Sequence, residues 1–252
     1  MKLLFLGTGA ADFLPSLADV DRFRLSPDIR RSTVTLVDEE VLLDCGPHLL
    51  DELQIHQVDK SKIQHILLSH KHSDHFNPEN VQALAAEAGG IHLWHRCGLE
   101  LPEIPQVIYH PMEVGKCYTV GQMEVTALDA NHVPGSVHYS IVTGGKKLFY
   151  GCDGAWLLHD TYYYMKDQRY DAMIMDATVG DYDGDFRMGE HNSIPMIRMM
   201  HRSFETWNVT KPETKMILSH LARTLHVSHA DTCRRVEKDG YLVAFDGMEL
   251  TV

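Results

Sequence analysis

Six apolar runs of strand length in this sequence each stop at an aspartate or a histidine. The polar groups that follow these runs are Asp44, the cluster at 70–75, His132, Asp153, Asp176 and His220. A single aspartate at a strand end often accepts only local backbone hydrogen bonds. Six such ends are better explained by strands that finish at one edge, where their side chains converge on a cleft.

The pattern of elements predicts an α/β fold. Strands are expected at 2–6, 32–37, 41–44, 63–69, 91–95, 106–109, 117–129, 137–143, 146–151, 172–175, 215–218 and 241–251. Helices are expected at 47–55, 78–88, 157–167, 191–206 and 229–238. The simplest layering packs two sheets face to face with helices outside both, a four-layer αββα sandwich. A chain of 252 residues can bury such a core as one domain, 1–252.

Composition narrows the classes of partner. The formal charge of −12, from 35 acidic and 23 basic side chains, argues against binding long nucleic acid, which relies on clustered Lys and Arg. A small anion stays compatible because bound divalent cations invert the local charge. No run approaches the roughly 20 apolar residues of a membrane span. The five cysteines form no close pair, which favours reduced thiols and a cytoplasmic location. A second copy of the chain is a candidate partner.

The 17 histidines are the abnormal feature of the composition, and histidine is the commonest metal-binding side chain. The stretch His70-Lys71-His72-Ser73-Asp74-His75, followed in order by His132, Asp153 and His220, resembles the signature of the metallo-β-lactamase-fold superfamily. The resemblance implies a centre for two divalent cations. One ion would be held by His70, His72 and His132, the other by Asp74, His75 and His220, and Asp153 would bridge both.

Such a set leaves open coordination positions, which is typical of a catalytic site. Without a cysteine ligand, zinc or manganese is expected, and iron and nickel also suit the donors. Asp44 and Asp176 are interpreted as outer carboxylates that orient ligand imidazoles by accepting their second N–H. The alternative for both is hydrogen bonding at a strand end alone.

Four further stretches narrow the resemblance. LLFLGTGAADFLP, SPDIRRS, GEHNSIPMI and YLVAFDGMELTV resemble the PhnP-like phosphoribosyl 1,2-cyclic phosphate phosphodiesterases. The resemblance implies hydrolysis of a small, cyclic ribose phosphodiester by metal-bound hydroxide, with Asp74 and Asp153 at the catalytic centre. It also implies that His191 meets the phosphate or protonates the leaving oxygen. A helix that begins at His191 would favour an anion there, and the alternative is a helix-start histidine with no role.

One departure from the PhnP-like pattern is clear. Segment 11–32 contains no cysteine, so the Cys-x-Cys-x-x-Cys group that holds a structural zinc in the bacterial enzyme is absent and no third metal is expected. Arg30 and Arg31 are candidates for phosphate contact or for ion pairs, and His138 is a candidate cleft residue. Two other functions stay open: a tRNA 3′-processing endonuclease, and a non-catalytic relative that handles a metal or cofactor.

Overall fold

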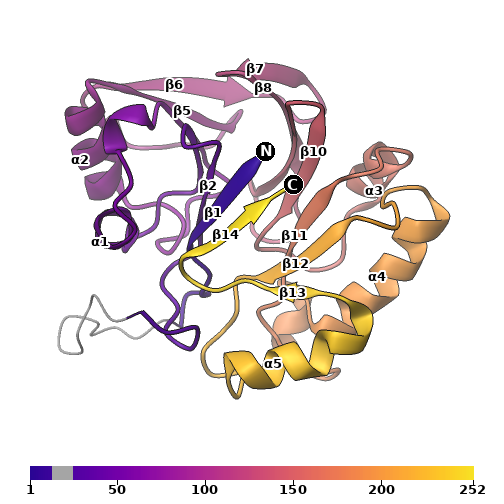
Figure 1. Ribbon diagram of the computed structural model, residues 1–252. Helices are drawn as coiled ribbons and strands as arrows, with labels where there is room; N and C mark the ends of the chain where they lie inside the picture. The colour runs from indigo at the N-terminus through magenta and orange to yellow at the C-terminus, as the bar shows by residue number, and fades with distance from the viewer. Residues whose placement is uncertain (13–24) are drawn as a thin grey trace.

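Two seven-stranded mixed sheets pack face to face, with helices on both outer faces (Figure 1). The computed structural model describes residues 1–12 and 25–252, so part of the cysteine-free segment 11–32 lies outside the described residues. The predicted αββα sandwich is confirmed. Each described helix is too short or too polar to cross a membrane.

The first sheet has the order β14-β1-β2-β3-β4-β5-β6. Its strands are β1 (Lys2–Gly7), β2 (Val34–Val37), β3 (Val41–Leu43), β4 (His65–Leu67), β5 (Ile91–Arg96), β6 (Val107–Met112) and β14 (Met248–Thr251). Helices α1 (Leu49–Ile55) and α2 (Pro78–Ala88) cover its outer face, with the short 3₁₀ helix η1 (Lys60–Lys62) between them in sequence. Helix α2 begins as its sequence indicates, because the Asn77 side chain accepts from Asn80 N and Pro78 occupies the first turn.

The second sheet has the order β13-β12-β11-β10-β9-β8-β7. Its strands are β7 (Cys117–Val120), β8 (Met123–Asp129), β9 (Val137–Thr143), β10 (Lys146–Gly151), β11 (Ala172–Asp176), β12 (Lys215–Ser219) and β13 (Leu242–Val243). Helices α3 (His159–Met165), α4 (Ile194–Thr206) and α5 (His229–Val236) cover its outer face (Figure 1). The 3₁₀ helices η2 (Phe186–Gly189) and η3 (Glu237–Asp239) lie in the connections.

Three apolar clusters separate the four layers. Side chains such as Leu43 and Ile174 fill the space between the sheets. A second cluster joins α1 and α2 to the first sheet, and a third joins α3, α4 and α5 to the second. Because strand side chains alternate between faces, neighbouring residues such as Leu42 and Leu43 belong to different clusters. Both faces of each sheet are therefore buried, and polar side chains gather at the strand ends.

Two of the predictions that differ from the structure change the description of an element. The single strand expected at 117–129 is the hairpin β7–β8, because Gly121 takes a left-handed conformation with φ of 56° and reverses the chain. The helix expected to begin at His191 begins at Ile194, because the Ser193 hydroxyl accepts from Met196 N and caps the first turn. His191 therefore lies before the helix, and the argument from a helix N-terminus does not apply to it.

A buried ionic cluster ties the first turn of the chain to the loop before β14. Asp246 accepts hydrogen bonds from the Thr8 hydroxyl at 2.8 Å and from the Arg31 backbone N at 2.8 Å. The Arg31 side chain is fully buried and pairs with Glu52 at 2.8 Å. Arg30 donates to Thr8 Oγ1 and to the Ala244 carbonyl. Both arginines therefore make structural contacts.

Candidate metal centre

The candidate ligands come from strand ends that share one edge of the sandwich. Strands β3 and β4 run parallel, as do β10, β11 and β12, so their carboxyl ends point the same way. The segment 70–75 follows β4, and the remaining residues follow five other strands: Asp44 after β3, His132 after β8, Asp153 after β10, Asp176 at the end of β11 and His220 after β12.

Three of these residues have left-handed backbones: Asp44, Asp153 and His220 have φ of 68°, 57° and 55°. Such angles are costly for residues other than glycine and concentrate at functional sites.

Three groups of donor atoms share Asp153, and the donor atoms of each group lie within 4.8 Å of one another. Two of the groups match the predicted sets: His70, His72, His132 and Asp153 form the first, and Asp74, His75, His220 and Asp153 form the second. The third consists of Asp153, Asp176, His191 and His220. Asp153 Oδ2 lies 3.1 Å from His70 Nε2, 3.3 Å from His132 Nε2 and 3.2 Å from His75 Nε2. The structure thus brings together all seven residues that the sequence pattern predicted, in the two sets expected.

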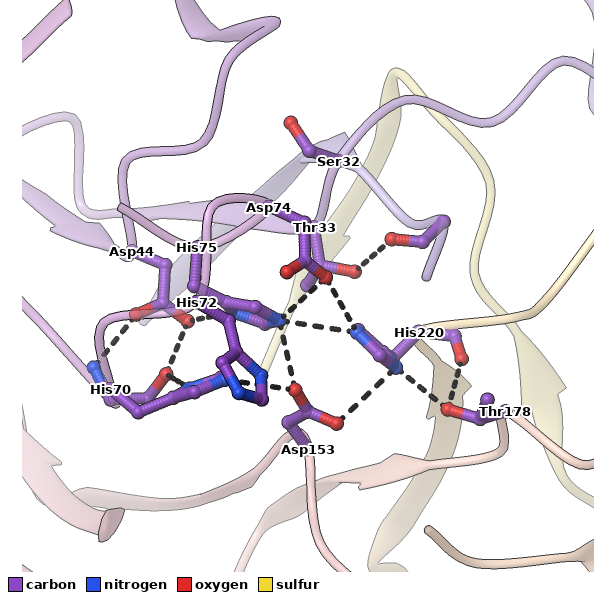
Figure 2. A network of polar contacts seen from close by, with 12 residues as sticks. Ser32, Thr33, Asp44, His70, His72, Asp74, His75, Asp153, Thr178 and His220 are labelled. Atoms are coloured by element: carbon purple, nitrogen blue, oxygen red, sulfur yellow. Dashed lines mark hydrogen bonds and ion pairs between the residues drawn. The ribbon is translucent and has the colours of Figure 1, made fainter. Parts of the chain in front are cut away.

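Asp44 orients the imidazoles of His75 and His70, which lie beside it (Figure 2). Its Oδ2 accepts from His75 Nδ1 at 2.8 Å, from Ser69 Oγ at 2.9 Å and from Tyr150 OH at 2.9 Å, while Oδ1 accepts from Ser69 N at 2.7 Å. Because Ser69 Oγ donates to Asp44, it accepts from His70 Nδ1 at 3.0 Å. The Nδ1 atoms of His70 and His75 are therefore engaged in hydrogen bonds to Ser69 and Asp44, and their Nε2 atoms face the cluster.

His220 and His132 are oriented in the same way. His220 Nδ1 lies 2.7 Å from the hydroxyl oxygen of Thr178 (Figure 2). That hydroxyl donates to Asp176 Oδ1 at 2.6 Å. His132 Nδ1 donates to the Glu190 carbonyl at 3.1 Å. Both leave Nε2 for the interior of the site. Asp176 therefore orients His220 through Thr178, which sequence reasoning missed although it stands two residues after Asp176.

His191 shares a further donor group with Asp153, Asp176 and His220. Its Nδ1 donates to Asp176 Oδ2 at 2.9 Å and lies 2.8 Å from Asp153 Oδ1. Burial opposes protonation of His191, but the Asp176 and Asp153 carboxylates outweigh it and raise its pKa to about 11. In the same way, the Asp74 and Asp44 carboxylates outweigh burial and hold the pKa of His75 well above its ordinary value.

These contacts fit divalent cations. Imidazole nitrogens and carboxylate oxygens converge with their lone pairs inward, and such an arrangement needs positive charge between them. Among the described residues, His70 Nε2 and Asp153 Oδ1 have no partner in hydrogen-bond geometry although both are buried. Burial opposes ionisation of Asp153, but neighbours led by His220 hold its pKa well below the ordinary value. Asp153 is therefore anionic, and a carboxylate among imidazole nitrogens is a good donor set for a transition metal.

A cleft of about 240 Å³ opens onto the donors. Its lining includes candidate ligands of both groups and the following further residues: Ala10, Ala11, Asp12, Thr178, Arg187, Glu190, His191 and Ala222. Sequence reasoning missed Asp12, Arg187 and Glu190, which lie in connections without periodicity.

His138 is fully buried behind Gly154 and is not among the described residues that line the cleft. Neither of its ring nitrogens has a hydrogen-bond partner in the described part of the chain. His229 begins helix α5 after the cap Ser228, as expected, and is not part of either donor group.

The sandwich and the converging donors define a class, the metal-dependent hydrolases of metallo-β-lactamase fold. A family model described as the beta-lactamase superfamily domain matches residues 39–221, and the chain belongs to this superfamily. Among curated proteins, ribonuclease Z of Methanococcus maripaludis is 28% identical over 147 residues. That match covers 56% of this chain and 43% of the length of the relative.

Solved structures share the fold over the whole chain. Zn²⁺-bound PqqB from Methylobacterium extorquens is 19% identical with a TM-score of 0.75, and 100% of each chain is covered. A diphosphatase of the PhnP family is 18% identical with a TM-score of 0.72, covering 100% of this chain and 97% of that one. The short form of human tRNase Z is 20% identical with a TM-score of 0.69, covering 100% and 99%.

Proposed function

We propose that this protein is a metal-dependent phosphodiesterase that hydrolyses a small phosphodiester, such as a cyclic ribose phosphate of the type cleaved by PhnP-like enzymes. The observation that carries the proposal is the sharing of Asp153 by two donor groups at the base of one cleft. A carboxylate placed between two cations is suited to a pair of metals that act on one phosphoryl group. The fold of the PhnP-family diphosphatase gives further support.

In this proposal seven residues hold two divalent cations, with zinc or manganese preferred and iron or nickel also compatible with the donors. These are His70, His72, Asp74, His75, His132, Asp153 and His220. The bound cations would supply Lewis-acid activation of the phosphoryl group and of the attacking water. The Zn²⁺ in the PqqB structure supports zinc.

The side chains of the protein would position the two donor groups and transfer a proton. Asp153 fixes the separation of the two donor groups, and Asp74 completes the second one beside His220 at 3.5 Å. His191 lines the cleft, and its Nδ1 is hydrogen-bonded to Asp176. Its Nε2 is therefore the nitrogen left to contact the phosphate or to give a proton to the leaving oxygen.

The test combines metal analysis with a substrate panel. Purified protein is loaded with zinc or manganese, its metal content is measured by plasma mass spectrometry, and turnover of bis-p-nitrophenyl phosphate and of ribose cyclic phosphates is followed. Asp153→Ala is expected to lose most of the metal and nearly all turnover. Asp160→Ala, at a fully exposed aspartate beside His159, is the matched control and is expected to keep both.

Two results would contradict the proposal. Wild-type turnover by folded Asp153→Ala would remove the role of that carboxylate. A metal-loaded wild type that is inert toward every phosphodiester of the panel would favour the non-catalytic alternative, a protein that handles a metal or cofactor.

A second candidate is tRNA 3′ processing, favoured by the partial match to ribonuclease Z. The net charge of −12 weighs against it, because binding of tRNA depends on neutralising many phosphates. Labelled tRNA at moderate salt separates the two functions. Binding together with removal of a 3′ trailer would favour the nuclease, and absence of both would leave the small phosphodiester.

A further inference from the structure

The charged side chains that line the cleft are mostly acidic, and one of them is an arginine. Four carboxylates line it: Asp12, Asp74, Asp153 and Glu190. Two divalent cations would offset these four charges. Within residues 1–12 and 25–252, Arg187 is the one arginine or lysine that lines the cleft. A guanidinium keeps its positive charge at every pH of interest, so Arg187 is a candidate contact for an anionic substrate such as a phosphodiester.

Arg187 is held in one orientation by its own loop. Its Nε donates to Asp185 Oδ1 at 2.8 Å and its Nη2 to Asp185 Oδ2 at 2.7 Å, a bidentate pair. Asp185 also accepts from the Arg187 backbone N at 2.9 Å. Hydrogen bonds from Arg187 lower the pKa of Asp185 to about 2, so the pair stays ionised across the neutral range. The pair engages one edge of the guanidinium and leaves the Nη1 group without a protein partner in the described residues.

Backbone carbonyls of the segment that carries Arg187 are hydrogen-bonded to residues of the candidate metal centre. The Arg187 carbonyl accepts from His191 N at 2.8 Å, and the Glu190 carbonyl accepts from His132 Nδ1 at 3.1 Å. Segment 187–191 therefore places Arg187, His132 and His191 on the same wall of the cleft. A guanidinium fixed in this way loses little entropy when it binds an anion, and its planar donors match phosphate oxygens.

We propose that Arg187, positioned by Asp185, binds a non-bridging phosphate oxygen of the substrate and selects phosphodiesters over uncharged esters. This inference rests on the proposed function and adds the residue that selects substrates by their charge. Asp185 acts through Arg187 and is a positioning residue. The superfamily match and the seven candidate ligands do not by themselves specify such a group.

The experiment compares Arg187→Gln, Arg187→Lys and Asp185→Asn with the wild type. The matched control is Arg234→Gln, because Arg234 also pairs with a nearby aspartate, Asp231 at 3.1 Å, but lies on α5 away from the cleft. Three quantities are measured for each zinc-loaded protein: bound zinc, the Kd for inorganic phosphate by calorimetry, and kcat and KM for bis-p-nitrophenyl phosphate and for the neutral ester p-nitrophenyl acetate.

Arg187→Gln is expected to keep its zinc, to weaken phosphate binding at least about tenfold, and to lower kcat/KM for the phosphodiester about 10- to 100-fold, because a charge-assisted contact with the phosphate is lost. The neutral ester should change less than threefold. Arg187→Lys should fall between wild type and Arg187→Gln, since it keeps the charge and loses the fork. Asp185→Asn should raise KM for the phosphodiester with little change in kcat. Arg234→Gln should match the wild type.

Phosphate binding by Arg187→Gln equal to that of the wild type would overturn the inference. An equal loss on both substrates would also overturn it, because the role would then be structural. If the wild type hydrolyses no phosphodiester, the proposed function fails separately, and the phosphate Kd of the variants still decides whether Arg187 binds an anion.

Discussion

Replacement of Asp44 by asparagine tests how strongly one buried carboxylate organises the metal centre. Asp44 accepts four hydrogen bonds, from Ser69 N, Ser69 Oγ, His75 Nδ1 and Tyr150 OH. An isosteric amide accepts through one atom only, so either the Ser69 backbone N or the other three donors face an NH₂ group. Leaving one buried donor unsatisfied costs about 1–3 kcal/mol, and weakening charged hydrogen bonds to neutral ones costs about 1 kcal/mol each.

We therefore expect Asp44→Asn to lower the free energy of unfolding by about 3–5 kcal/mol, which is roughly 10 °C in Tm for a domain of this size. Because His75 loses its charged partner, affinity for zinc should fall about 10- to 100-fold. The assay is thermal and urea unfolding of the metal-free protein, followed by competition for zinc with a chromogenic chelator. Tyr150→Phe is the matched control, since it removes one donor, keeps the carboxylate and should cost about 1 kcal/mol. If Asp44→Asn is no less stable than Tyr150→Phe and binds zinc as the wild type does, the reasoning is refuted.

Three further predictions concern metal, packing and pH. Removal of metal by a chelator should lower Tm, and zinc restored at about 100 times its Kd should add about 2.7 kcal/mol, or about 5–10 °C; an unchanged Tm would argue against a site built around a cation. Gly46→Ala should destabilise the protein by about 1–3 kcal/mol and weaken zinc binding, because the new methyl would overlap the Asp74 carbonyl oxygen, whereas Gly184→Ala, with open space around it, should do neither. Burial lowers the pKa of His226 to about 4, so the folded protein binds fewer protons than the unfolded chain as pH falls from about 6.5 to 4, and stability is lost across that window by about 3 kcal/mol. His226→Gln should flatten this dependence in urea unfolding of the metal-free protein, and a slope equal to that of the wild type would contradict the assignment.

The strand-end pattern predicted that polar groups meet at one edge of a layered α/β fold, and the resemblance to the superfamily implied their division into two ligand sets. Apolar runs stop where a buried strand leaves the core, so a polar residue at that point is placed at an edge by geometry alone. Asp44 accepts from the second ring nitrogen of one candidate ligand, His75, at 2.8 Å, as expected of an outer carboxylate. Asp176 also accepts from an imidazole, although its direct partner is His191, which is outside the seven candidate ligands.

What could not be predicted lies in the connections. Arg187 and Glu190 occupy a loop whose course depends on tertiary contacts, such as that between the Glu190 carbonyl and His132. The start of α4 was misplaced because two competing signals, Glu190-His191 and the Ser193 cap, lie within four residues. Local chemistry favours Ser193, since its hydroxyl satisfies a backbone N–H that His191 does not reach.

The cluster of Thr8, Arg31 and Asp246 has a consequence for biosynthesis. Its members are separated by up to 238 positions in the sequence. Strand β1 pairs with β14, which is synthesised after a similar number of residues. At about 5–20 residues per second, a ribosome delivers Asp246 roughly 10–50 s after Thr8. During that time Arg31 lacks one of its carboxylate partners and β1 presents an open edge, so the nascent chain is exposed to aggregation and to chaperones until β14 is made.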